Sequence, residues 1–284
     1  PMKKLFYPIF SAFEQALQIF TTKLAGSLAK SEQKRLKNYL INYFIHNFDV
    51  NMAEAEITNA FDYKSFNDFF TRPLKKDART IDPANFSLAS PVDGTISEFG
   101  TIVIDKLIQA KNIEYSLAAL LNDHAQAKAY KNGNFITIYL APTDYHRIHM
   151  PVTAKLESMS YVPGRLYPVK PAVVETVKDV FALNERLICN FSSQFGTFAL
   201  VLVGAQLVSG LETVWHGAIK ESRPKTWDYK SKQIILNKGQ EMGRFNFGST
   251  IILCLKNNVK FEDNIKKNKT ILLGAALAQF TSEV

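Results

Sequence analysis

A short loop near the end of the printed sequence reads Lys238-Gly239-Gln240-Glu241-Met242-Gly243-Arg244-Phe245-Asn246-Phe247-Gly248-Ser249-Thr250, and residues 251–255 continue it as Ile-Ile-Leu-Cys-Leu. A glycine-containing loop before an apolar run predicts a turn that enters a buried strand. Gly248 lets the backbone adopt φ and ψ values that other residues avoid. The Ser249 hydroxyl adjoins the preceding carbonyl, which it could attack if a base removed its proton. The loop is therefore either a plain turn or a reactive Gly-Ser peptide, and the second reading needs a base elsewhere in the chain.

The composition limits the class of protein. A length of 284 residues suffices for one large domain or two modest ones, and a hydrophobic content of 46% excludes a disordered chain. The sequence has no run of about 18 apolar residues, so we expect no transmembrane helix. No segment has the pattern of a secretory signal. Cys189 and Cys254 lie in apolar segments and are expected to be buried free thiols; no metal-binding spacing is present.

The net charge of +8 is concentrated at the two ends of the chain. Residues 1–50 hold seven Lys and Arg against three Asp and Glu, and residues 220–284 hold twelve against six. Basic ends around a nearly neutral centre indicate an anionic partner, either membrane lipid or nucleic acid. A basic surface that serves only solubility is the alternative.

Two amphipathic helices are predicted before residue 50. In residues 3–23 the apolar positions recur at steps of three and four, namely Phe6, Phe10, Phe13, Leu17 and Phe20. This helix suits a membrane interface, with the phenylalanines facing the lipid, or it packs on its own domain. A second helix is expected after Ser31, with an apolar side and a basic side that holds Lys34, Arg35 and Lys37.

The rest of the chain predicts mostly strands. Short helices are expected at residues 53–61, at 66–70 with Ser65 as the N-cap, at 115–130 and at 177–184. The predicted strands cover residues 135–141, 154–161, 186–191, 197–203, 206–214, 249–255 and 270–273, and residues 220–232 are expected to form a basic, mobile loop. Strands that follow one another without regular helices favour an antiparallel sheet or a closed barrel. The predicted fold is therefore α+β: N-terminal amphipathic helices, then a largely antiparallel, barrel-like domain.

Two histidines stand in a loop between Pro142 and Pro151. His146 and His149 are three residues apart, directly after a predicted buried strand. They are either a metal-binding pair, for which no third ligand is evident, or two imidazoles with separate roles in proton transfer.

Three other polar residues have ambiguous roles. Asp93 precedes Gly94 at a bend, where an aspartate usually serves the turn alone. Arg72 follows Phe69-Phe70-Thr71, and it either binds a phosphate or carboxylate with two nitrogens or forms a structural ion pair. His216 ends a predicted strand, and no role follows from its position.

Taken together, these segments resemble the phosphatidylserine decarboxylases, and the bacterial, membrane-associated branch fits best. The resemblance runs from about residue 50 to the end of the sequence. It is carried, in this order, by Phe69-Phe70-Thr71-Arg72, Pro91-Val92-Asp93-Gly94, Asp144-Tyr145-His146-Arg147-Ile148-His149-Met150-Pro151, Asn184-Glu185-Arg186, Val203-Gly204-Ala205 and Lys238-Gly239 through Gly248-Ser249-Thr250.

The resemblance implies a self-cleaving precursor with a triad of Asp93, His149 and Ser249. His149 would take the proton of Ser249, and Asp93 would hold the imidazole in the correct tautomer. The Ser249 oxygen would attack the Gly248 carbonyl, and β-elimination from the resulting ester would break the chain. This gives a β chain, residues 1–248, and an α chain, residues 249–284. The serine remnant would become dehydroalanine and then, with loss of ammonia, a pyruvoyl group.

The resemblance also implies the second reaction. Phosphatidylserine would form a Schiff base with the pyruvoyl group made from Ser249 and lose CO₂, which gives phosphatidylethanolamine. His146 is implied in decarboxylation, and we assign it as the proton donor; Arg72 is a tentative substrate-binding residue. No metal and no nucleic acid are expected.

The implied organisation is a membrane-associating segment, residues 2–50, and a catalytic domain, residues 51–284. The protein would lie on the cytoplasmic side of the cell membrane as a peripheral protein on anionic lipid, and a homodimer is a further expectation. Two other readings remain: a pyruvoyl decarboxylase of a soluble amino acid, and a basic module that binds nucleic acid or lipid without catalysis.

Overall fold

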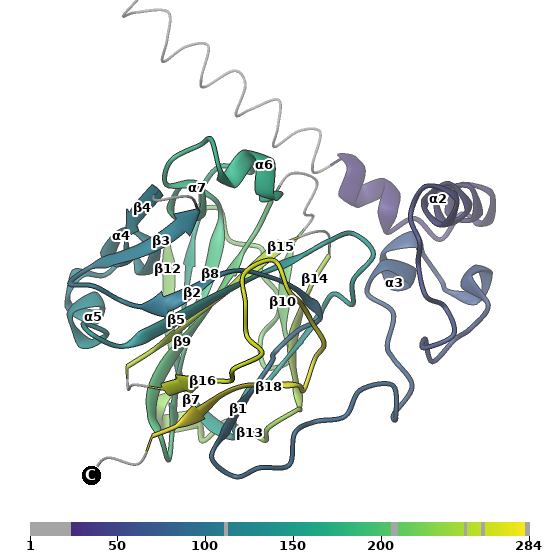
Figure 1. Cartoon of the computed structure of the whole chain (residues 1–284). Coiled ribbons are helices and arrows are strands. Elements are labelled where there is room, and N and C mark those ends of the chain that lie inside the picture. Colours follow the sequence, from purple (N-terminus) through teal and green to yellow (C-terminus); the bar gives the residue numbers. More distant parts are fainter. Residues whose placement is uncertain (1–23, 111–112, 206–209, 247–248, 257–258, 282–284) are drawn as a thin grey trace, which may run out of the picture.

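The central feature of the fold is a nine-stranded antiparallel sheet (Figure 1). The computed structural model describes residues 24–110, 113–205, 210–246, 249–256 and 259–281. The strands of the sheet lie in the order β12 (Lys225–Asp228), β7 (Ala154–Val162), β8 (Arg186–Ser193), β9 (Gly196–Val203), β15 (Ser249–Leu255), β5 (Asn134–Leu140), β2 (Gly94–Thr101) and β17 (Thr270–Ile271), and β13 (Ile235–Leu236) also pairs with β7.

Strand β15 is buried on both faces, as its apolar sequence predicts. Every residue from Ser249 to Leu255 is buried. Ile251 and Leu253 belong to one apolar core, whereas Ile252 and Cys254 belong to a second core on the opposite face of the sheet. Side chains alternate between the faces of a strand, so a strand between two cores reads as a continuous apolar run. The strand predicted at residues 249–255 is confirmed.

Three smaller sheets surround the main one. They are β11 (Gly217–Ala218), β10 (Leu211–Thr213), β14 (Glu241–Phe245) and β6 (Arg147–His149); β1 (Ser87–Ala89), β18 (Ala276–Phe280) and β16 (Val259–Phe261); and β3 (Lys106–Ala110) with β4 (Ile113–Ser116). The strand ladders are antiparallel. The expected α+β, largely antiparallel fold is confirmed. The sheets of the described residues stay open and form no closed barrel.

The named helices are short apart from α2, which has 14 residues. They are α2 (Lys34–Asn47), η1 (Ala60–Asp62), α3 (Phe66–Phe70), α4 (Leu117–Leu121), α5 (His124–Ala129), α6 (Pro171–Val174), α7 (Val180–Leu183) and η2 (Lys230–Lys232). Helices α2 and α3 pack on each other at the side of the sheet, through an apolar cluster that includes Ile41, Phe44 and Phe69. None of the described helices is long and apolar enough to cross a membrane.

Several local predictions differ from the structure. The helix expected at residues 53–61 is only the turn η1, and the helix expected at 115–130 is split because Asn122 has a left-handed backbone, with φ of 52°. The basic segment 220–232 contains β12, which pairs with β7. Lys37, expected on the basic side of its helix, is buried. Its Nζ donates to the carbonyls of Phe61 (2.5 Å) and Tyr63 (2.6 Å). The helix expected at residues 3–23 lies outside the described residues.

Other expectations are met in whole or in part. Ser65 caps α3, and its Oγ accepts from the Asp68 N–H at 3.1 Å. Both cysteines are buried free thiols. Of the strand expected at 206–214, only residues 211–213 form β10, and residues 206–209 are not described.

Candidate active site

Ser249 is the first residue of β15 and lies opposite Leu140 of β5. Its side chain is completely buried, and its Oγ has no hydrogen-bond partner in the described part of the chain. A buried hydroxyl without a partner costs about 1–3 kcal/mol. Such groups are rare in native proteins, and each calls for an explanation. The expected cleavage partner, Gly248, lies outside the described residues.

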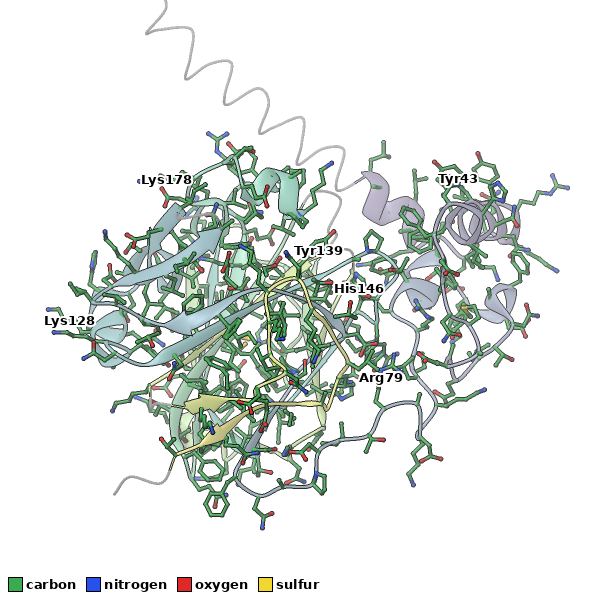
Figure 2. All side chains as sticks on the ribbon, in the orientation of Figure 1. Tyr43, Arg79, Lys128, Tyr139, His146 and Lys178 are labelled. Atoms are coloured by element: carbon green, nitrogen blue, oxygen red, sulfur yellow. The ribbon has the colours of Figure 1, made fainter. Side chains whose placement is uncertain are left out.

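His146 is fully buried beside the helical segment (Figure 2). Its Nδ1 lies 2.8 Å from the carbonyl oxygen of Asp144. Because a carbonyl only accepts, Nδ1 carries the proton and Nε2 presents a lone pair. Nε2 has no hydrogen-bond partner among the described residues, and the Phe70 ring packs at 4.2 Å between centroids. Burial lowers the pKa of His146 from 6.5 to about 3, against the opposing effect of the Asp144 carbonyl. The imidazole is therefore neutral at physiological pH.

His149 is held at both ring nitrogens. Its Nδ1 donates to the carbonyl oxygen of Gly239 at 2.8 Å, and its Nε2 accepts from the Tyr145 hydroxyl at 3.0 Å. Burial lowers the pKa of His149, and the carbonyl of Gly239 opposes this change. The tautomer is thus the one that a base acting through Nε2 requires, but Tyr145 holds that nitrogen.

Gly239 binds His149 from a position that favours glycine. Its φ is +79°, a left-handed conformation that side chains disfavour. A Cβ at this position would lie 2.8 Å from the side chain of Ile81. The first glycine of the loop quoted above therefore brings a backbone carbonyl to the imidazole.

Asp93 makes its hydrogen bonds with groups other than His149. Arg79 donates from Nε to Oδ1 at 2.9 Å and from Nη2 to Oδ2 at 2.5 Å. The N–H of Leu273 also donates to Oδ1, at 2.7 Å. Arg79 reaches Glu54 as well, at 2.8 Å. The negative charge of Asp93 still raises the pKa of His149, although burial has the larger effect. Asp93 therefore acts on His149 by a Coulombic interaction, and the two side chains form no direct hydrogen bond.

A cavity of about 210 Å³ opens beside these groups. Its lining includes His149, Tyr145, Gly239 and Arg79, together with Lys75 and Lys76. Sequence reasoning missed Arg79, Tyr145 and Gly239 as parts of the site. The cavity places positive charge next to His149, a setting that suits an anionic ligand.

Arg72 is buried, with 3% of its surface exposed. Its Nη2 donates to the carbonyl of Thr143 at 3.3 Å, whereas Nε and Nη1 have no hydrogen-bond partner in the described part of the chain. Burial lowers its pKa, and its positive charge in turn lowers the pKa of His146. Among the described residues Arg72 forms no salt bridge, so the structural ion pair is not observed. The guanidinium has donors available for an anion close to His146.

His216 lies apart from these residues. Its Nδ1 is 2.9 Å from the Tyr229 hydroxyl, and its ring packs edge-on against Trp227 at 4.7 Å. Of the two expected histidines, by contrast, His146 directly precedes β6 and His149 is its last residue. No group of three or more His, Cys, Asp or Glu side chains suited to a metal occurs within the described ranges.

Comparison with known proteins identifies the family. The family model described as phosphatidylserine decarboxylase matches residues 66–279. The chain is 46% identical over 268 residues to the phosphatidylserine decarboxylase proenzyme of Marinobacter nauticus, covering 92% of this chain and 94% of the relative. It is 47% identical over 258 residues to the proenzyme of the same name from Dechloromonas aromatica, covering 89% and 91%. It is also 47% identical over 269 residues to that from Francisella tularensis subsp. holarctica, covering 92% and 94%.

These matches define the class first: the family is one of decarboxylases, which are lyases. More narrowly, the chain belongs to the phosphatidylserine decarboxylase family.

Proposed function

We propose that the protein converts phosphatidylserine to phosphatidylethanolamine and CO₂ after it has cleaved itself between Gly248 and Ser249. The observation that carries the proposal is the buried Ser249 Oγ, which has no hydrogen-bond partner in the described residues. Ser249 is the first residue of the central strand β15. The relatives of the chain are named phosphatidylserine decarboxylase proenzymes. A buried, unpartnered nucleophile adjoining the bond to be broken fits a precursor that reacts once.

For self-cleavage, His149 is the base that takes the Ser249 proton through Nε2. The Gly239 carbonyl fixes the tautomer, and Asp93 stabilises the imidazolium through its charge. The Tyr145 hydroxyl must leave Nε2 before the proton is taken, because both compete for one lone pair. The Ser249 oxygen then attacks the Gly248 carbonyl, and elimination from the ester separates residues 1–248 from residues 249–284.

Ser249 suits the formation of a pyruvoyl group, because its hydroxyl is buried and has no hydrogen-bond partner in the described residues. A pyruvoyl group supplies a carbonyl that withdraws electrons from the α carbon of the serine headgroup as CO₂ leaves. His146 has an open lone pair at Nε2, so it would take a proton from the ammonium of the serine headgroup and return that proton to the α carbon after CO₂ leaves. Arg72 binds the carboxylate or phosphate of the lipid through Nε and Nη1.

Residues 2–50 form the membrane-facing segment of this proposal, and residues 51–284 form the catalytic domain. Support comes from α2, where Tyr39 and Tyr43 expose 68% and 59% of their surface. Tyrosines of this kind occur at membrane–water interfaces. The protein lies on the cytoplasmic side of the membrane as a peripheral protein and functions as a homodimer.

A mass spectrum of the purified protein, combined with a CO₂-release assay, tests the function. We expect two fragments that correspond to residues 1–248 and 249–284, the second beginning with a pyruvoyl group. Incubation with carboxyl-labelled phosphatidylserine is expected to release labelled CO₂. Release of CO₂ by a protein that remains a single chain would contradict the self-cleavage, and cleaved protein without release would contradict the substrate.

Gly239→Ala tests whether the Gly239 carbonyl orients His149. The new Cβ would meet Ile81 at 2.8 Å in a left-handed backbone, so we expect lower thermal stability and self-cleavage slowed by more than about tenfold. Gly217→Ala is the matched control, because Gly217 has φ of +78° and no atom within 4 Å of the added Cβ. It should carry only the backbone cost, about 1–2 kcal/mol, and cleave at the normal rate. Equal cleavage rates in the two variants would remove Gly239 from the mechanism.

A further inference from the structure

The Tyr145 hydroxyl occupies the one nitrogen of His149 that can take a proton. The Nδ1–H of His149 donates to the carbonyl oxygen of Gly239 at 2.8 Å, so only Nε2 has a lone pair. The Tyr145 hydroxyl lies 3.0 Å from Nε2, and it is the donor because Nε2 can only accept. Burial raises the pKa of Tyr145, so the hydroxyl keeps its proton at physiological pH. The lone pair that self-cleavage would use is therefore engaged in this structure.

The fold determines the position of Tyr145. Its side chain is buried, with 5% of its surface exposed, and its ring centroid lies 5.7 Å from that of His149. The preceding residue, Asp144, closes a turn with Ala141: the Asp144 N–H donates to the Ala141 carbonyl at 3.0 Å, and Asp144 Oδ2 accepts from the Ala141 N–H at 2.7 Å. The turn and the burial together hold the phenol against the imidazole.

The hydroxyl can leave Nε2 without unfolding of the site. Tyr145 and His149 both line the cavity of about 210 Å³ described above. This volume has room for several water molecules, since one water takes up about 30 Å³ of the liquid. A hydroxyl that turns toward water exchanges one hydrogen bond for another. The net contribution of such a bond changes an equilibrium by a factor of about 2 to 13.

We propose that Tyr145 is a positioning residue that acts through His149 and slows the self-cleavage of the precursor. The inference rests on the proposed function, because it takes His149 as the base of that reaction. The hydrogen bond from Tyr145 keeps the imidazole oriented but engages its lone pair. Ser249 therefore reacts only in those molecules in which the hydroxyl has turned away, and the precursor contains a restraint on the rate of its own maturation.

The variant Tyr145→Phe tests the proposal. Each precursor is made by cell-free translation, and its cleavage is followed over time by denaturing electrophoresis. We expect Tyr145→Phe to cleave faster than the wild-type protein, by a factor of about 2 to 13, because Nε2 is free in every molecule. If the hydroxyl served only the packing of the site, its loss would slow cleavage or leave the rate unchanged.

Tyr229→Phe is the matched control. Tyr229 is also buried, and its hydroxyl lies 2.9 Å from Nδ1 of His216, a histidine apart from the site. This variant should cleave at the wild-type rate. If the wild-type protein cleaves and Tyr145→Phe cleaves no faster, the inference alone is overturned. Absence of cleavage in both of these proteins would contradict the proposed function and the inference together.

A second measurement needs no cleavage. The pKa of His149 is measured by NMR in Ser249→Ala and in the double variant Ser249→Ala with Tyr145→Phe. A hydrogen bond donated to Nε2 stabilises the neutral imidazole, so we expect a higher pKa of His149 in the double variant. The other charged groups near His149 are the same in both proteins, namely Asp93, Arg147, Glu241, Lys75, Lys76 and Arg79. Equal pKa values would overturn the proposal.

Discussion

The Ser249→Ala variant is expected to remain one intact chain and to release no CO₂ from phosphatidylserine. Alanine removes the oxygen that would attack the Gly248 carbonyl, and it also removes the atoms from which a pyruvoyl group would be made. The variant should nevertheless fold. Ser249 Oγ is buried without a partner, and removing such a hydroxyl relieves a desolvation cost of about 1–3 kcal/mol. Its melting temperature should equal or exceed that of an uncleaved His149→Ala precursor.

Thr250→Val is the matched control for Ser249→Ala. Thr250 is the next residue of β15, and its Oγ1 is likewise buried without a hydrogen-bond partner in the described residues. Valine replaces this hydroxyl with a group of nearly the same shape, so cleavage should proceed. Mass spectrometry distinguishes the outcomes. Cleavage of Ser249→Ala would exclude Ser249 as the nucleophile. If Thr250→Val also failed to cleave, the loss of cleavage in both variants would be explained by altered packing of β15.

His146→Ala is expected to cleave itself normally but to lose at least about 100-fold in the rate of decarboxylation, the usual contribution of a positioned acid or base. The two histidines have different surroundings, so we assign them to different steps. His149 donates to the Gly239 carbonyl, whereas His146 has an open Nε2 close to Arg72. Fragment analysis and CO₂ release measure the two steps independently. A His146→Ala protein that remains one chain would contradict this division of roles.

The lowered pKa of His146 predicts how the free energy of unfolding changes with pH. Its folded-state pKa of about 3 lies below the ordinary 6.5, so between these values the unfolded chain binds a proton that the folded chain does not. The contribution of His146 to the free energy of unfolding is therefore fully present above about pH 6.5. It falls as the pH decreases toward 3, by at most about 1.4 kcal/mol per pH unit. His146→Ala should reduce this slope, as measured by urea unfolding between pH 4 and 7. An unchanged slope in His146→Ala would contradict this prediction.

The sequence predicts those elements that local pattern alone determines. The apolar run after Ser249 specifies a strand buried on both faces, and Ser65 specifies the start of α3 through its hydroxyl. The helix predicted at 115–130 is divided into α4 and α5, because Asn122 adopts a left-handed backbone, which Asn tolerates better than most residues. The sequence does not predict strand β12, because the basic segment around it, residues 220–232, resembles a loop; its pairing with β7 identifies the strand.

The same limit applies to the site. Side chains with recognisable chemistry, such as His146 and His149, are evident in the sequence. The structure places His146 just before β6 and His149 at its last residue. The groups that hold them are less evident. His149 is bound by a backbone carbonyl at Gly239, and residue type does not identify such an acceptor. Arg79 reaches Asp93 from fourteen residues away, and neither residue type nor spacing predicts that pair.

The position of β15 changes the molecularity of unfolding. This strand lies between β9 and β5, and β16, β17 and β18 follow it in the same C-terminal segment. If the chain is cut before Ser249, the two fragments remain held by these ladders, yet unfolding then releases two separate molecules. Refolding becomes a bimolecular reaction that depends on protein concentration, whereas the precursor refolds in a unimolecular one. The mature protein therefore resembles an obligate heterodimer whose subunits were folded as a single chain.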